Sequence, residues 1–323
     1  MCNLPSSVEK INCIVLLGPT AVGKTALGVS LARHFDWDII SADSRQVYRG
    51  LDIGSGKDLS EYTTGGKAVK AHLIDVVSLA EEYTVFRFQK DFYALFDSFL
   101  PLNKMPFVVG GTGLYIDSIV RSYQMVDVPE DKDFHASLEK KSLEELDTML
   151  LQLRPKLHNK SDLLIKERVI RAIEIETFMQ SPKGQQEKQK SLERTKINAL
   201  VLGTTVPREK LHQNIQRRLK TRLNEGMIEE VESLHSSGAS WERLERLGLE
   251  YRFISEYLEG KIESKEEMEE KLYHAICQFA KRQETWFRGM QKKGIKIHWL
   301  NQHGDAIAKY DEALSLIERN LNC

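Results

Sequence analysis

A phosphate-binding motif stands near the start of the chain, in the octapeptide Gly18-Pro19-Thr20-Ala21-Val22-Gly23-Lys24-Thr25. Its spacing is G-x-x-x-x-G-K-[ST], in which backbone N–H groups of a loop and of the following helix converge on one anion. Lys24 adds a cation, and the Thr25 hydroxyl can bind a Mg2+ ion that accompanies the phosphates. The residues predicted to hold a diphosphate or polyphosphate are Gly18, Thr20, Ala21, Val22, Gly23, Lys24 and Thr25. The motif does not identify the molecule that carries the phosphates.

Two further turns follow apolar segments that are typical of buried strands. Asp43 comes after Trp37–Ser41, and Gly110-Gly111-Thr112-Gly113 comes after Met105–Val109. Ligands of open α/β sheets bind at the carboxyl ends of the strands, so both turns are expected near the phosphate loop. Glycine has no Cβ, which lets the second turn approach a ligand closely. Either turn could also be a purely structural connection.

Three kinds of chemistry fit this set. In a small-molecule kinase, Asp43 would orient an acceptor hydroxyl while lid arginines neutralise the γ-phosphate. In a transferase that uses a pyrophosphate ester, the loop would hold the leaving group. In a nucleotide-gated RNA binder without catalysis, the loop would switch a conformation. Spacing and composition leave all three open.

Basic residues gather on several predicted helices. Arg208–Arg222 carries six lysines and arginines against one acid, and Arg168 and Arg171 share a face of another helix. Lys271–Met290 contains basic groups interleaved with Trp286, a combination that suits phosphate contact and base stacking. The alternative is an ordinary solvated surface, with Phe287 in the core.

The order of the segments predicts an α/β fold: a P-loop-type parallel sheet with an inserted all-helical domain. Strands are expected at 11–17, 37–41, 72–77, 105–109, 197–203 and 295–300, and helices at 26–35, 85–100, 137–153, 163–179 and 306–321. Strand signals vanish between 127 and 193, so the core is predicted at 1–123 and 195–323 and the insertion at 124–194. Residues 54–71 and 181–196 are rich in polar residues and glycine, which predicts a mobile loop and a linker.

Bulk composition excludes some classes. The 323 residues are 41% hydrophobic, which supports a packed core, and the net charge of -1 gives no global nucleic-acid signal. Four scattered cysteines without a C-x-x-C pair predict reduced thiols in a cytoplasmic protein. The N-terminus has no signal-peptide pattern, and no apolar run is long enough to span a membrane. A monomer is the expected state.

In the order of its motifs, the sequence resembles the tRNA dimethylallyltransferase family, in the form found in bacteria. The segments that carry the resemblance span nearly the whole chain: GPTAVGKT (18–25), SADSRQVYRGLDIGSGK (41–57), HLID (72–75), VVGGTGLY (108–115), ERVIRAIEI (167–175), YRFISEYLEG (251–260) and AKRQETWFRG (280–289). The family transfers a dimethylallyl group to N6 of an adenine beside the anticodon of tRNA, at position 37. Relatives that prenylate free adenine nucleotides share the loop and part of the second segment.

The resemblance implies roles for individual residues. The loop would bind dimethylallyl diphosphate with Mg2+, Asp43 would act as general base, and the Thr112 hydroxyl would lie at the reaction centre. Contacts with tRNA are implied for Asp43, Ser44, Arg45, Gln46, Thr112, Glu167, Arg168, Arg171, Tyr251, Arg252, Lys281, Arg282, Gln283, Thr285, Trp286 and Arg288. The chain departs from the family in having His135 where a basic residue is common, and in its longer 58–71 loop.

Overall fold

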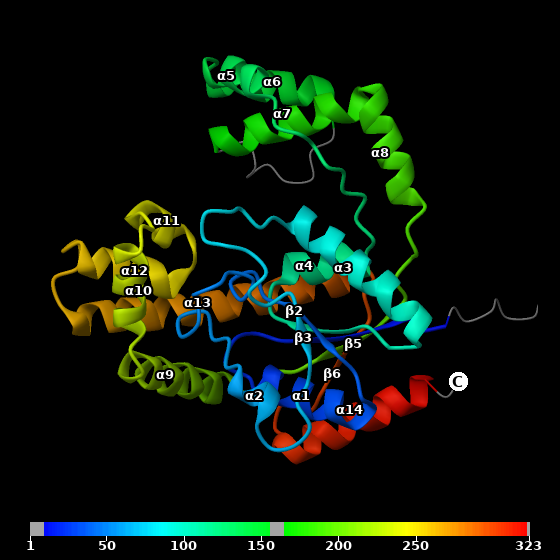
Figure 1. The fold of residues 1–323 in the computed structure, drawn as a ribbon, viewed down its shortest axis with the longest axis vertical. Helices are drawn as coiled ribbons and strands as arrows, with labels where there is room; N and C mark the ends of the chain where they lie inside the picture. The colour runs from blue at the N-terminus through cyan, green and yellow to red at the C-terminus, as the bar shows by residue number, and fades with distance from the viewer. Residues whose placement is uncertain (1–9, 156–164, 322–323) are drawn as a thin grey trace, which may run out of the picture. The chain divides into compact units, whose positions relative to one another are not determined.

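The structure is a computed structural model, and it describes residues 10–155 and 165–321. Its centre, seen in Figure 1, is a sheet of parallel strands. The strand order is β3-β2-β4-β1-β5-β6. The strands are β1 (Cys13–Leu17), β2 (Ile39–Ala42), β3 (Ala71–His72), β4 (Phe107–Gly110), β5 (Ala199–Gly203) and β6 (Ile297–Trp299). The predicted fold class, an α/β protein with a parallel sheet, is confirmed.

Both faces of the sheet are buried, as parallel sheets require. In β1, Cys13, Val15 and Leu17 enter one apolar cluster, while Ile14 and Leu16 enter another on the opposite face, because successive strand residues point in opposite directions. Helices α1 (Lys24–Phe35) and α14 (Ala306–Leu321) contribute to the second cluster and lie along the same side in Figure 1.

Most of the other helices pack around the first cluster. They are α3 (Val85–Phe99), α4 (Gly113–Val120), α9 (Arg208–Asn224), α10 (Met227–Ser236), α11 (Trp241–Arg246), α12 (Leu249–Leu258) and α13 (Lys265–Lys292). The last of these is longer than predicted, and Phe287 lies in the core as expected, with 0% of its surface exposed. A 3-10 turn, η1 (Leu100–Leu102), follows α3 and has no buried residue. The packing of these helices brings one long helix, α13, to the edge of the sheet where the predicted functional turns lie.

The chain divides into two compact units, one of Met1–Ser122 with Ile197–Cys323 and the other of Tyr123–Lys196. The second unit has its own apolar cluster and contains α5 (Lys132–Glu139), α6 (Leu143–Leu153), α7 (Lys166–Gln180) and α8 (Pro182–Leu192). The prediction of one helix over 137–153 is wrong at its start, because α5 ends at Glu139 and a capping box of Ser142 and Glu145 begins α6. The predicted start of the next helix at 163 lies outside the described residues.

Two predicted loops are ordered by local chemistry. The prediction of a linker at 181–196 is wrong, because Ser181 caps the helix α8, which begins at Pro182. Proline at the first position of a helix costs no hydrogen bond. The 54–71 loop contains the short helix α2 (Ser60–Thr63), and residues 54–57 are buried. There the Lys57 ammonium donates to the Tyr48 carbonyl (2.8 Å) and forms ion pairs with Asp52 and Asp75.

Cys13 and Cys277 are free thiols, and Cys2 and Cys323 lie outside the described residues. None of the helices that the structure describes is long and apolar enough to cross a membrane.

Candidate functional site

The phosphate loop connects β1 directly to α1. Gly23 adopts a φ of 82°, a conformation that glycine reaches without strain, and α1 begins at the next residue. A side chain at Gly18 would collide with the carbonyl oxygen of Thr204, whose N–H donates to the Leu17 carbonyl (2.8 Å). The backbone therefore has the tight strand-to-helix turn that the motif predicts, with the positive end of the α1 dipole at the loop.

Lys24 is the cation of this loop, and its ammonium donates to the Pro19 carbonyl at 2.8 Å. Burial lowers the pKa of Lys24 to about 8. The Asp43 carboxylate opposes this decrease, while the guanidinium groups of Arg218 and Arg45 add to it. Cationic side chains thus outnumber the Asp43 carboxylate around a partly buried amine, which is a setting that favours an anion.

Asp43 and Thr112 come together because β2 and β4 are neighbours in the sheet. The Ser44 N–H donates to the Thr112 hydroxyl (3.0 Å), and the Thr112 N–H donates to the Ala42 carbonyl (3.0 Å). The Asp43 carboxylate also accepts from the Arg45 N–H (3.1 Å), so it shapes its own turn as well. Asp43 lines a small polar pocket of about 50 Å³ together with Lys24 and Thr25 of the phosphate loop.

Sequence reasoning missed two members of this pocket, Arg218 and Arg222 of α9. The Arg218 guanidinium lies 3.4 Å from the Thr20 hydroxyl, and both guanidinium groups lie 3.4 Å from the Asp58 carboxylate. Burial and the neighbouring Arg218 lower the pKa of Arg222 to about 10. The basic run at 208–222 was the available signal, but nothing in the sequence indicated which of its arginines point inward.

Gln283 holds the phosphate loop and the glycine-rich turn together. Its amide oxygen accepts from the Thr20 N–H (2.9 Å), and its amide nitrogen donates to the Gly111 carbonyl (2.9 Å). The side chain is buried. Gln283 thus makes contacts within the protein at the position for which the resemblance implies a tRNA contact, and it lines the pocket of Asp43.

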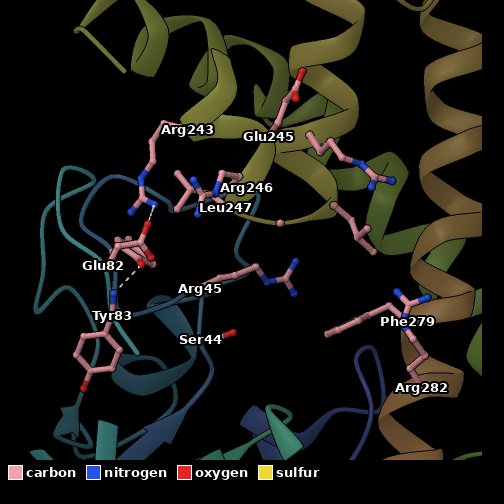
Figure 2. A pocket seen from close by; sticks show the side chains of 14 residues that line it. Ser44, Arg45, Glu82, Tyr83, Arg243, Glu245, Arg246, Leu247, Phe279 and Arg282 are labelled. Carbon is pink, nitrogen blue, oxygen red and sulfur yellow. Dashed lines mark hydrogen bonds and ion pairs between the residues drawn. The ribbon is translucent and has the colours of Figure 1, made fainter. Parts of the chain in front are cut away.

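A second cavity, of about 500 Å³, lies beside the first and is shown in Figure 2. Ser44 and Arg45 line it from the end of β2, and Phe279 and Arg282 line it from α13. Arg45 extends toward α13, with its guanidinium carbon 5.5 Å from the centre of the Phe279 ring, and forms an ion pair with the buried Glu250 carboxylate. Glu250 and Asp43 raise the pKa of Arg45 although burial alone would lower it. The result is a cationic cavity with an aromatic wall.

The remaining residues implied in tRNA contact within the core unit differ in exposure. Lys281, Arg282, Thr285, Trp286 and Arg288 are exposed on α13, and Trp286 packs on Gly113. Arg252 lies at the second cavity, with its guanidinium 4.5 Å from the Phe253 ring centre. Two of them are buried. Tyr251 is fully buried and donates to Glu230 (2.8 Å), and Gln46 is buried and donates to the Gly56 carbonyl (3.1 Å).

Glu167, Arg168 and Arg171 belong to the helical unit. All three are exposed, the first two at the start of α7. The Arg171 guanidinium also donates to Glu174 (2.9 Å) and to the Val128 carbonyl (3.2 Å). His135 also bonds to Glu174 (2.7 Å), and this bond raises the pKa of His135. His135 can therefore supply positive charge near Arg171.

The oxygen donors at the phosphate loop fit Mg2+. The Thr25 hydroxyl and the Asp43 carboxylate line the same pocket, and Mg2+ binds such hard oxygen ligands together with water and phosphate. In residues 10–155 and 165–321, no group of three or more His, Cys, Asp or Glu side chains could hold a metal alone. These residues suit a metal that is bound jointly with a diphosphate.

Fold and site define a P-loop α/β protein whose anion-binding loop adjoins a cationic cavity. A family model described as IPP transferase matches residues 46–290, and one described as isopentenyl transferase matches residues 11–75. A tRNA dimethylallyltransferase of Treponema denticola is 50% identical over 292 residues, 90% of this chain and 96% of that protein. One from Parabacteroides distasonis is 43% identical over 315 residues, 98% of this chain and 99% of that protein.

Solved structures agree. The tRNA isopentenylpyrophosphate transferase of Bacillus halodurans superposes with a TM-score of 0.69 at 30% identity, covering 97% of both chains. A eukaryotic dimethylallyltransferase acting on tRNA has a TM-score of 0.75 at 22% identity, with 96% of this chain and 79% of that one covered, and shows the shared fold. The chain belongs to the IPP transferase family, whose curated relatives here are tRNA dimethylallyltransferases, and the resemblance is confirmed.

Proposed function

We propose that this protein transfers a dimethylallyl group from dimethylallyl diphosphate to N6 of the adenine at position 37 of tRNA, beside the anticodon. The observation that carries the proposal is the meeting of the phosphate loop, Asp43 and Thr112 at one edge of the sheet, next to a cationic cavity large enough for a flipped-out base. Family membership supplies the donor and the acceptor.

The diphosphate binds to the N–H groups of the loop, to the Lys24 ammonium and to the Arg218 guanidinium. Thr25 would hold Mg2+, which neutralises charge on the leaving group when it is bound. The Thr112 hydroxyl donates to a diphosphate oxygen. These groups stabilise negative charge where it develops as the leaving group departs.

The adenine enters from the cavity of Arg45 and Phe279, where its ring can stack on an aromatic or guanidinium plane. Its exocyclic nitrogen forms a bond with the allylic carbon as the bond from that carbon to the diphosphate oxygen breaks. The proton of N6 passes to the Asp43 carboxylate, which acts as general base, and the electron pair leaves with the diphosphate. Water must be kept from the cationic allylic carbon while it reacts.

The exposed basic residues of α13, together with Arg168 and Arg171, bind tRNA phosphates. We also place the reaction in the cytoplasm, where tRNA is found. We also propose that the protein acts as a monomer.

The test is a product assay with the purified protein, Mg2+, dimethylallyl diphosphate and tRNA that lacks the modification. After digestion of the RNA, mass spectrometry should detect isopentenyladenosine. AMP and ATP are offered as acceptors in parallel. Prenylated AMP or ATP in place of tRNA would refute the acceptor, and phosphate transfer from ATP without prenylation would refute the reaction.

A further inference from the structure

Gln283 occupies a position between the two loops that would carry the reaction. It projects from α13, a helix near the end of the chain, and reaches the phosphate loop at Thr20 and the glycine-rich turn at Gly111, both at 2.9 Å. These contacts span 263 and 172 residues of sequence. A single amide therefore bonds directly to both loops, in addition to the pairing of β1 with β4 that precedes them.

The chemistry of the contact suits an amide. One loop presents an N–H donor and the other presents a carbonyl acceptor, so the bridging side chain must accept and donate from one short planar group. A carboxylate lacks the donor, and an ammonium or guanidinium lacks the acceptor. The fit is also close, because a Cβ at Gly111 would lie 2.6 Å from the Gln283 amide nitrogen. Gly111 is thus the residue that admits the amide.

The bridge acts at the reaction centre through its neighbours. Thr112 follows Gly111 directly, and its hydroxyl is held by the Ser44 N–H beside Asp43. Lys24 stands four residues after Thr20 in the same loop, and its ammonium would lie 3.6 Å from a Cβ at Gly111. Movement of the amide would shift Thr112 relative to the bound diphosphate, and a displacement of about 1 Å can cost on the order of 100-fold in rate.

We propose that Gln283 is a positioning residue that sets the distance between the diphosphate loop and the Thr112 turn, rather than a tRNA contact. The proposal rests on the proposed function, because it concerns the same reaction. It goes beyond that function because it assigns Gln283, on the helix proposed to bind RNA, a positioning role at the diphosphate site. Its exposed neighbours on α13 keep the RNA-binding role.

The test is Gln283→Met, which has nearly the same length and no amide. The matched control is Gln278→Met, the same change at an exposed position of the same helix. For each variant we would measure kcat, KM for dimethylallyl diphosphate, Kd for tRNA, and the thermal midpoint. Gln283→Met should lose about 100-fold in kcat/KM for the donor. Its Kd for tRNA should stay within about threefold, and Gln278→Met should match the wild type within about twofold.

A second variant covers the case in which Gln283→Met does not fold. Gly111→Ala would place a methyl group against the amide and should reproduce the loss of kcat with tRNA binding retained. Wild-type turnover in either folded variant would refute the positioning role. A parallel loss of tRNA affinity and turnover in Gln283→Met would return the residue to RNA contact. Absence of product from the wild type and from Gln278→Met would instead refute the proposed function.

Discussion

Removing the Glu230 carboxylate should loosen the loop that adjoins the diphosphate pocket. Glu230 lies in the first turn of α10 and accepts hydrogen bonds from three consecutive backbone N–H groups, those of Asp52 (3.1 Å), Ile53 (2.6 Å) and Gly54 (3.1 Å). It also accepts from the Tyr251 hydroxyl (2.8 Å). In Glu230→Ala all four donors lose this acceptor.

The expected cost follows from these bonds. A hydrogen bond to a charged acceptor contributes about 1.5–3 kcal/mol. The loop lies near the surface, and water can replace part of what is lost. We therefore expect a decrease of about 3 kcal/mol in the free energy of unfolding, from bonds of this kind partly compensated by water. For a unit of this size that corresponds to a decrease of about 6 °C in thermal midpoint.

The change should also reach the donor site. A side chain at Gly56 would collide with the guanidinium groups of Arg218 and Arg222, so the loop held by Glu230 packs directly on these arginines. KM for dimethylallyl diphosphate should rise about tenfold, as expected when one charge-assisted contact is weakened. The Kd for tRNA should not change.

The control is Glu229→Ala, which removes the same charge from the same helical turn at an exposed position. Both variants lose the favourable interaction with the α10 dipole, about 0.5 kcal/mol, so their difference isolates the loop contacts. Thermal unfolding and steady-state kinetics would be measured side by side. Equal midpoints and equal KM values in the two variants would refute the reasoning.

Three further predictions concern the proposed chemistry. Asp43→Ala should reduce turnover by at least about 100-fold, the usual contribution of a general base, with tRNA binding retained; near-normal single-turnover rates would exclude the assignment. The pKa of Lys24 is lowered to about 8, so kcat/KM for dimethylallyl diphosphate should fall above that pH as the ammonium is lost, and a flat profile to pH 9.5 would contradict it. The unfolded chain keeps this proton up to the ordinary lysine pKa of 10.5, so between about pH 8 and 10.5 the unfolded state binds more protons than the folded one. The contribution of Lys24 to the free energy of unfolding therefore rises with pH in that range, and a loss of donor binding in it would not reflect an effect of Lys24 on folding. Arg282→Ala should reduce the slope of log Kd for tRNA against log salt concentration by about one, as expected for the loss of one phosphate contact. The control, Lys292→Ala at the C-terminal end of α13, should leave this slope unchanged. An unaltered slope in Arg282→Ala would mean that Arg282 contacts no phosphate.

Local signals were sufficient for the loops that carry the chemistry. The phosphate loop, the turn after β2 and the turn after β4 each combine a strand, a short motif and a helix, and such patterns determine the backbone within a few residues. The parallel sheet then brings their ends to one edge. Asp43, Lys24 and Thr112 could thus be predicted as neighbours.

Contacts across the chain could not be predicted in the same way. Arg218 and Gln283 lie 198 and 263 residues from Thr20 of the phosphate loop, and their inward orientation depends on how α9 and α13 pack. Polar residues were also wrongly assigned to the surface where hydrogen bonds and ion pairs compensate for their burial. Lys57 looked like part of a solvated loop, yet its ammonium is buried because two carboxylates and a carbonyl surround it.

The arginines of the site are held in two different ways, which suits two different tasks. Arg45 is paired with a buried carboxylate, Glu250, and breaking such a pair costs about 3–5 kcal/mol, so Arg45 forms a fixed wall of the base cavity. Arg218 faces Asp58, a half-exposed carboxylate at 3.4 Å, and an exposed pair contributes only about 0–1 kcal/mol. A diphosphate carries more charge and presents it closer to the loop, so it can displace Asp58 from Arg218 at little cost. Under the proposed function, the site would combine a rigid surface for the base with an arginine that already faces the phosphate loop and is only weakly paired.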